Sequence, residues 1–131
     1  MLNPLHSANA RHSQHAVFPN DTITAPVTHV AMSFMRPNVF NVAVGSHDWP
    51  AMWQTVQETR AQFREGVKVL IAIGGWGDTE GFSIGARTAD SRKRWAANVA
   101  AMVSDTGADG AFRPSERGPL VEIDSEADFV A

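Results

Sequence analysis

The segment from Val67 to Phe82, VKVLIAIGGWGDTEGF, constrains the fold of this chain more than any other feature. Its first part, residues 67–73, is an apolar run interrupted only by Lys68, which is the pattern of a strand in a parallel sheet covered on both faces. A glycine-rich loop that carries Trp76 and Asp78 follows directly. Because parallel strands need long crossover connections, the segment predicts an α/β fold.

The neighbouring segments alternate between strand and helix patterns. Residues 27–34 are apolar and rich in branched side chains, as expected for a strand. Residues 49–63 carry apolar side chains at spacings of three and four, which predicts a helix. A second helix is predicted from a cap at Thr88 or Asp90 up to Gly107.

A third strand is predicted to begin at residues 108–110. The order strand, helix, strand, helix, strand then indicates a parallel sheet with right-handed crossovers. The strand-to-helix connections after Phe34 and Ile73 are long, and ligands of α/β folds bind at the carboxyl ends of the strands. The sequence therefore predicts that Trp76 and Asp78 lie at the working face.

The glycine loop fits a sugar site better than a nucleotide site. It is one residue longer than the dinucleotide fingerprint, and it does not lead directly into a capped helix. The indole of Trp76 suits stacking on the apolar face of a sugar ring, although a loop anchor packed on its own helix is the alternative. Phe34 is predicted to line the same site, and a buried core position is its alternative.

The composition of the 131 residues excludes several classes of protein. A net charge of −3 argues against a nucleic-acid partner, and the absence of cysteine excludes disulfides and zinc–cysteine sites. The histidines at positions 6, 12 and 15 lack partners at ligand spacing, so no metal site and no cofactor are predicted. No apolar run predicts a signal peptide or a membrane span, so we expect a cytoplasmic chain if the N-terminus is genuine; the compartment is otherwise open.

Three motifs together carry a resemblance to a known family. They are THVAMSF at residues 28–34, the strand end Ala72-Ile73-Gly74-Gly75-Trp76, and GADG at residues 107–110. Over about residues 14–110 the chain resembles glycoside hydrolase family 18, the fungal chitinase type. The resemblance implies a partial (β/α)8 TIM barrel, truncated to about strands 2 to 4.

The resemblance also implies a function. The family hydrolyses β-1,4-linked N-acetylglucosamine polymers by substrate-assisted retaining chemistry, in which a glutamic acid protonates the glycosidic oxygen. The partners implied are N-acetylglucosamine oligomers or chitin. The substrate-binding residues implied are Phe34, Gly74, Gly75, Trp76 and Asp78.

The catalytic motif departs from the family pattern. The third family strand ends in Ser-x-Gly-Gly, and the serine position here is Ala72. The fourth family strand carries Asp-Gly-x-Asp-x-Asp-x-Glu, whereas here Asp109-Gly110 is followed by residues 111–115 with the sequence AFRPS. We therefore expect the aspartates and the glutamate of the motif to be missing from their normal places, and no intact catalytic set.

A displaced copy of the motif is the weaker alternative. Residues 121–126 read VEIDSE, in which Glu126 would be the acid and Asp124 its orienting partner. An acidic tail produces such an alternation by coincidence, and we favour that explanation.

These observations divide the chain into an irregular N-terminal segment (1–24), a partial barrel (25–110) and a divergent acidic tail (111–131). A partial barrel leaves open sheet edges, which favour self-association. Three functions remain: a truncated chitinase that is inactive alone, a non-catalytic chitin-binding protein, and an unstable product with no sugar role.

Overall fold

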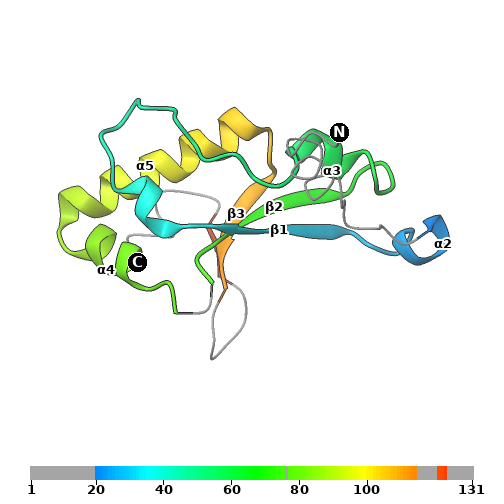
Figure 1. The fold of residues 1–131 in the computed structure, drawn as a ribbon, viewed down its shortest axis with the longest axis horizontal. Coiled ribbons are helices and arrows are strands. Elements are labelled where there is room, and N and C mark those ends of the chain that lie inside the picture. The colour runs from blue at the N-terminus through cyan, green and yellow to red at the C-terminus, as the bar shows by residue number, and fades with distance from the viewer. Residues whose placement is uncertain (1–19, 76, 115–120, 124–131) are drawn as a thin grey trace, which may run out of the picture.

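The computed structural model describes residues 20–75, 77–114 and 121–123 and contains one four-stranded sheet with helices packed on it (Figure 1). The elements are α2 (Asp21–Thr24), β1 (His29–Met35), η1 (Pro37–Phe40), α3 (Val56–Arg60), β2 (Lys68–Ile73), α4 (Glu80–Ala86), α5 (Ala89–Thr106), β3 (Gly110–Arg113) and β4 (Val121–Ile123). The predicted α/β fold is confirmed.

The strand order is β1-β2-β3-β4, with the first three strands parallel and β4 antiparallel to β3. The strand β2 is central, because β1 pairs with it on one side and β3 on the other. Among the described strands, β1 and β4 are the two edges, so the sheet is open. The predicted succession of three parallel strands is therefore confirmed, and β4 is an addition to it.

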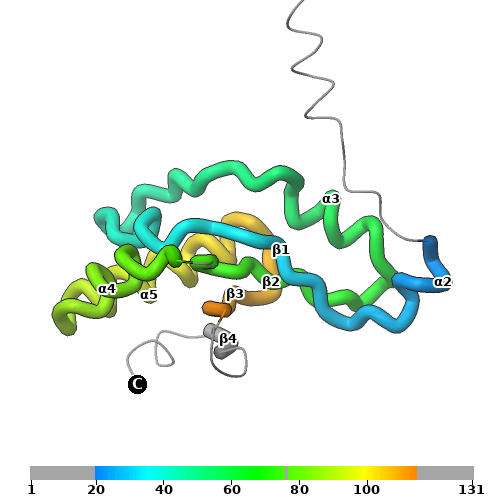
Figure 2. The backbone as a smooth tube through the Cα atoms, turned by 60° about the horizontal axis from the view of Figure 1, so that its bottom comes forward, coloured from blue at the N-terminus to red at the C-terminus, as the bar shows by residue number. Residues whose placement is uncertain are grey.

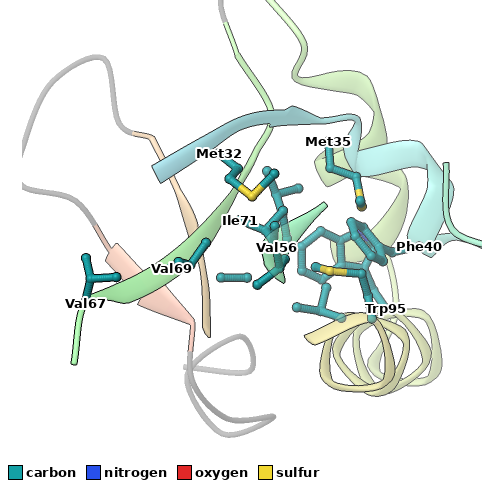
Figure 3. Packing of buried hydrophobic residues seen from close by; sticks show 12 residues of the cluster. Met32, Met35, Phe40, Val56, Val67, Val69, Ile71 and Trp95 are labelled. Carbon is teal, nitrogen blue, oxygen red and sulfur yellow. The ribbon is translucent and has the colours of Figure 1, made fainter. Parts of the chain in front are cut away.

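The hydrophobic core lies between the sheet and α5 (Figure 3). Alternate residues of β2 face it, and one side of α5 covers them. Trp95 is fully buried in α5, and its indole nitrogen donates a hydrogen bond to the Pro37 carbonyl at 3.0 Å, which ties the helix to η1. The buried cluster comprises Met32, Met35, Phe40, Val56, Val67, Val69, Ile71, Ile73, Trp95, Val99, Met102 and Ala111.

Helix α5 follows the sequence prediction closely. Thr88 caps it through a hydrogen bond from the Ser91 N–H to the Thr88 hydroxyl at 3.0 Å. The helix ends at Gly107, which has the left-handed conformation (φ 75°) that favours glycine. Both ends of the helix are thus determined by local residues.

Asp109 fixes the register between β2 and β3. Its N–H donates to the Val69 carbonyl and the Val69 N–H donates to its carboxylate, each at 2.8 Å. Arg60 of α3 donates to the same carboxylate at 2.8 Å and to the Gly107 carbonyl at 2.9 Å. Burial raises the pKa of Asp109, but the Val69 hydrogen bond and Arg60 outweigh it, so the pKa lies below its ordinary value. The Asp109 carboxylate therefore joins α3 and β2 to the segment that leads into β3.

The predicted helix over residues 49–63 is wrong in its extent. The helix α3 begins at Val56, because the Thr55 hydroxyl accepts from the Glu58 N–H and the Glu58 carboxylate accepts from the Thr55 N–H. This capping box starts the helix later than the apolar spacing suggested. The long connection from β1 to α3 instead runs alongside β1 (Figure 2).

The secondary structure at the two boundaries of the predicted partial barrel differs from the prediction. Residues 21–24 form the short helix α2, capped by Asn20, inside the segment expected to be irregular. Strand β3 continues to Arg113, beyond the predicted division at Gly110, and it ends before Pro114, which lacks an N–H for the sheet. The three-part division of the chain stays a prediction.

The substitution Asp109→Asn should lower the free energy of unfolding by about 1–2 kcal/mol, because it weakens hydrogen bonds to a charged group. The folded-state pKa is depressed, so the stabilisation is complete above the ordinary aspartate pKa of about 3.9 and disappears as the pH falls through the lower folded value. Urea unfolding should show a difference between wild type and variant that shrinks below about pH 4. The matched control Glu65→Gln removes an exposed charge and should change stability little. A pH-independent difference would contradict the role of Asp109.

Candidate functional site

The carboxyl end of β1 presents Phe34 to solvent. Ser33 pairs with Ala72 and Met35 pairs with Ile73, so β1 has one extra residue, Phe34, between two consecutive pairs. Such a bulge redirects the side chain at its centre. Phe34 is 57% exposed, whereas the next residue, Met35, is buried. The peptide bond between Ser33 and Phe34 is cis.

The glycine pair after β2 lies against this bulge. Gly74 and Gly75 have φ values of 102° and 152°, in the region that favours glycine. The Gly74 N–H donates to the Met35 carbonyl at 2.9 Å, which joins the loop to the end of β1. A Cβ atom added at Gly75 would lie 3.5 Å from the Phe34 ring, and one at Gly74 would lie 2.8 Å from the Phe82 ring. The first distance is an ordinary contact, so the positive φ is what requires glycine at position 75, whereas at position 74 the Phe82 ring also leaves no room for a side chain.

Asp78 closes the loop at the same end of the sheet. Its N–H donates to the Gly75 carbonyl at 3.3 Å, and its carboxylate accepts from the Arg36 Nε at 3.4 Å. Arg36 directly follows β1, so this exposed ion pair bridges the loops after β1 and β2. An exposed pair of this kind contributes little stability, and its charges stay accessible to a ligand.

The predicted binding residues thus fall into two groups. The structure brings Phe34, Gly74, Gly75 and Asp78 together at the carboxyl ends of β1 and β2. Trp76, predicted to stack on a sugar, lies outside the described residues.

A groove of about 240 Å³ opens beside Phe34. Trp53, which is 54% exposed, lines the same groove, together with Pro50 and Met52 of the long connection. The sequence did not predict a place for Trp53 at this site, because the predicted helix over residues 49–63 includes this tryptophan. The available signal was its place in a long strand-to-helix connection, where binding residues concentrate.

The face of the sheet opposite the core carries two positions of the family motif. Ala72 holds the serine position, and Phe112 holds the position of the first aspartate after Asp109-Gly110. The two residues are register partners in β2 and β3, and they are 0% and 5% exposed. A polar pair in the family pattern is therefore an apolar, buried pair in this chain.

The count along the motif corrects one prediction. The glutamate of the motif stands seven residues after its first aspartate, and seven residues after Asp109 is Glu116. The expectation that the glutamate is missing from its place is therefore wrong, whereas the two aspartate positions do hold Phe112 and Pro114. Counting from Asp109 was the signal that could have found Glu116. Glu116, Asp124 and Glu126 all lie outside the described residues.

The described residues hold neither a metal-type cluster nor a membrane-spanning helix. No group of three histidine, aspartate or glutamate side chains within residues 20–75, 77–114 and 121–123 is arranged to hold a metal ion. No helix in that part of the chain is long and apolar enough to cross a membrane.

A double-mutant cycle tests the contact between Ala72 and Phe112. Ala72→Val should overpack the site and cost about 1–3 kcal/mol, and Phe112→Leu should cost about 1 kcal/mol. The double variant should cost at least about 0.5 kcal/mol less than the sum of the two single variants. The leucine side chain is smaller than the phenylalanine ring and so leaves room for the methyl groups that valine adds.

The control combines Ala72→Val with Val67→Ala. Val67 lies in the core five residues before Ala72, at the amino end of β2, so its cost should add to that of Ala72→Val. Urea unfolding measures all of these values. Strict additivity of the Ala72 and Phe112 changes would contradict the register.

The chain is similar to a family of known proteins and to one curated relative. The family model described as Glycosyl hydrolases family 18 matches residues 6–111, which begins before the segment predicted from the motifs. Probable chitinase 10 of Drosophila melanogaster is 30% identical over 96 residues, which is 70% of this chain and 4% of that protein. The chain thus spans a small part of the curated relative that it matches. The family match and this relative show that the chain belongs to glycosyl hydrolase family 18.

Proposed function

We propose that this chain is part of a chitinase-type (β/α)8 barrel, equivalent to about strands 2 to 4, that binds N-acetylglucosamine oligomers and does not cleave them alone. The observation that carries the proposal is the exposed Phe34 ring beside the bare backbone of Gly75. Family membership supports the choice of sugar, and the relative named above is itself called a probable chitinase.

The groove beside Phe34 supports sugar binding. Aromatic faces stack on the apolar faces of pyranose rings, and Phe34 and Trp53 both line the groove. Arg36 and Asp78 supply charged hydrogen-bonding groups at the same end of the sheet. In the proposal, Trp76 extends the platform, since it directly follows Gly75.

The substitutions in the motif support the lack of hydrolysis. Substrate-assisted chemistry in this family needs a glutamic acid and an aspartate two residues earlier that orients the acetamido group. The orienting position before Glu116 is Pro114, which has no carboxylate. With Glu116 alone the acetamido group would lack its orienting carboxylate, so binding without turnover is the expected behaviour.

The direction of β4 counts against the displaced motif. Val121 pairs with Arg113 and Ile123 pairs with Ala111, so the chain leaves β4 at the amino end of the parallel strands. The glycine loop lies at the carboxyl end. The direction of β4 therefore gives no support to a displaced catalytic pair at the sugar site.

The proposal extends to association with other chains. Strand β1 is an edge of the sheet among the described strands, and an open edge offers backbone groups for pairing. In a complete barrel a preceding strand would occupy that edge. Self-association through β1 is the expected behaviour when no such strand is present.

Calorimetric titration with the N-acetylglucosamine tetramer tests binding. The chain should bind saturably, and Phe34→Ala should weaken binding about 3–10-fold, the equivalent of one aromatic contact. Trp76→Ala should weaken binding by a similar factor. The matched control Ile23→Ala removes a side chain that is also exposed, on α2 near the amino end of β1, and should leave the affinity unchanged. No saturable binding by a folded chain would contradict the proposal.

An assay for tetramer cleavage on the same samples tests the second half of the proposal. No product should form with the wild-type chain. Cleavage that disappears in Glu116→Gln would contradict the inactive motif, and cleavage that disappears in Glu126→Gln would instead support the displaced one.

A further inference from the structure

Asp105 connects α5 to the long segment between η1 and α3. Its carboxylate accepts a hydrogen bond from the His47 Nδ1 at 2.6 Å and another from the Trp49 indole nitrogen at 2.8 Å. Both donors belong to residues 41–55, which contain no helix or strand. Connections of this length without secondary structure are usually functional. The two hydrogen bonds therefore fix part of a segment that has no secondary structure of its own to hold it.

Local forces do not favour this contact at either of its ends. Asp105 lies in the last turn of α5, where the helix dipole disfavours a negative charge and no basic residue is present. His47 has a φ of 49°, in the left-handed region that is costly for a residue other than glycine. The hydrogen bonds from His47 and then from Trp49 lower the pKa of Asp105, so its carboxylate is charged at neutral pH. Unfavourable local features persist where the surrounding structure holds them in place, and they concentrate at functional sites.

Trp49 links this contact to the groove beside Phe34. The Trp49 ring packs against the core, with its centroid 5.7 Å from that of Phe40, while its N–H reaches Asp105. The next four residues, 50–53, all line the groove. The position of Trp49 therefore determines where this part of the groove wall begins.

We propose that Asp105 is a positioning residue for the sugar groove, which it does not itself line. By fixing Trp49, Asp105 holds residues 50–53 in place as part of the groove wall before a sugar binds. Such preorganisation raises affinity, because the wall need not be ordered when the ligand binds. This inference rests on the proposed sugar-binding function.

Calorimetric titration of the full chain with the N-acetylglucosamine tetramer tests the proposal. The variant Asp105→Asn has nearly the same shape but lacks the charge that strengthens both hydrogen bonds, so it should bind the tetramer about 3–10-fold more weakly. The matched control Asp48→Asn removes the same charge from an exposed position in the same segment and should leave the affinity within about 2-fold of wild type. An equal loss in both variants would indicate a general effect of charge and would overturn the proposal.

A double-mutant cycle separates positioning from a loss of stability. In the Trp53→Ala background the positioned wall has lost its largest side chain, so Asp105→Asn should weaken binding by no more than about 2-fold further. In the Phe34→Ala background the missing ring belongs to β1, so the full effect of Asp105→Asn should remain. An equal loss in both backgrounds is what a less stable chain would give, and it would contradict the positioning role.

NMR spectra of the ligand-free chain provide a readout that does not depend on sugar binding. In Asp105→Asn the Trp49 indole proton should exchange with solvent at least about 10-fold faster, and the Trp53 indole signal should shift, whereas Asp48→Asn should leave both unchanged. If the wild-type chain does not bind the tetramer, the proposed function fails, and these spectra still decide whether Asp105 positions Trp53. An unshifted Trp53 signal in a folded Asp105→Asn variant would show that it does not.

Discussion

The hydrogen bonds of Asp109 are the constraint on which the rest of the structure depends. Its N–H and its carboxylate both bond to Val69, once as donor and once as acceptor. These two bonds determine which residues of β2 and β3 stand opposite each other. Because side chains alternate along a strand, a slip by one residue would turn every side chain of β3 to the other face.

The register determines the chemistry of the sheet face opposite the core. With Asp109 beside Val69, Ala72 lies opposite Phe112, and both are buried. The serine and aspartate of the family pattern would meet at this point of the sheet. Here the pair is apolar on both strands, so neither residue leaves a buried polar group without a partner, which would be costly. The polar residue of the family pattern is thus replaced by an apolar one on both strands, β2 and β3.

The site at the carboxyl ends of the strands depends on the bulge in β1 as well. The extra residue frees Phe34 from the regular alternation, and the Gly74 N–H then bonds to the Met35 carbonyl. The positive φ of Gly75 lets the loop lie beside the ring. The Phe34 ring, the backbone of the loop at Gly75 and the exposed Arg36–Asp78 ion pair thereby come together at one end of the sheet.

The sequence predicted the elements whose signals are local. The apolar run of β2 and the cap and terminating glycine of α5 are encoded in neighbouring residues, and both were found. The extent of α3 was not, because Trp49 and Met52 have helical spacing but line a cavity in an extended connection. A capping box at Thr55 decides where that helix begins.

The site was predictable only in part. The glycine loop placed Gly74, Gly75 and Asp78 correctly, because carboxyl ends of parallel strands share one edge of a sheet. The bulge at Phe34 and the position of Trp53 depend on tertiary packing, which no local pattern reveals. Glu116 needed only a count along the motif from Asp109.

The measurement that tests this account most directly is a set of nuclear Overhauser contacts from the Phe112 ring in the full chain. The account predicts contacts from the ring protons to the Ala72 methyl group, together with contacts between the Phe34 ring and the α-protons of Gly75. Contacts from Phe112 to Ile71 or Ile73, which face the core, would show that β3 has slipped by one residue and would contradict the register.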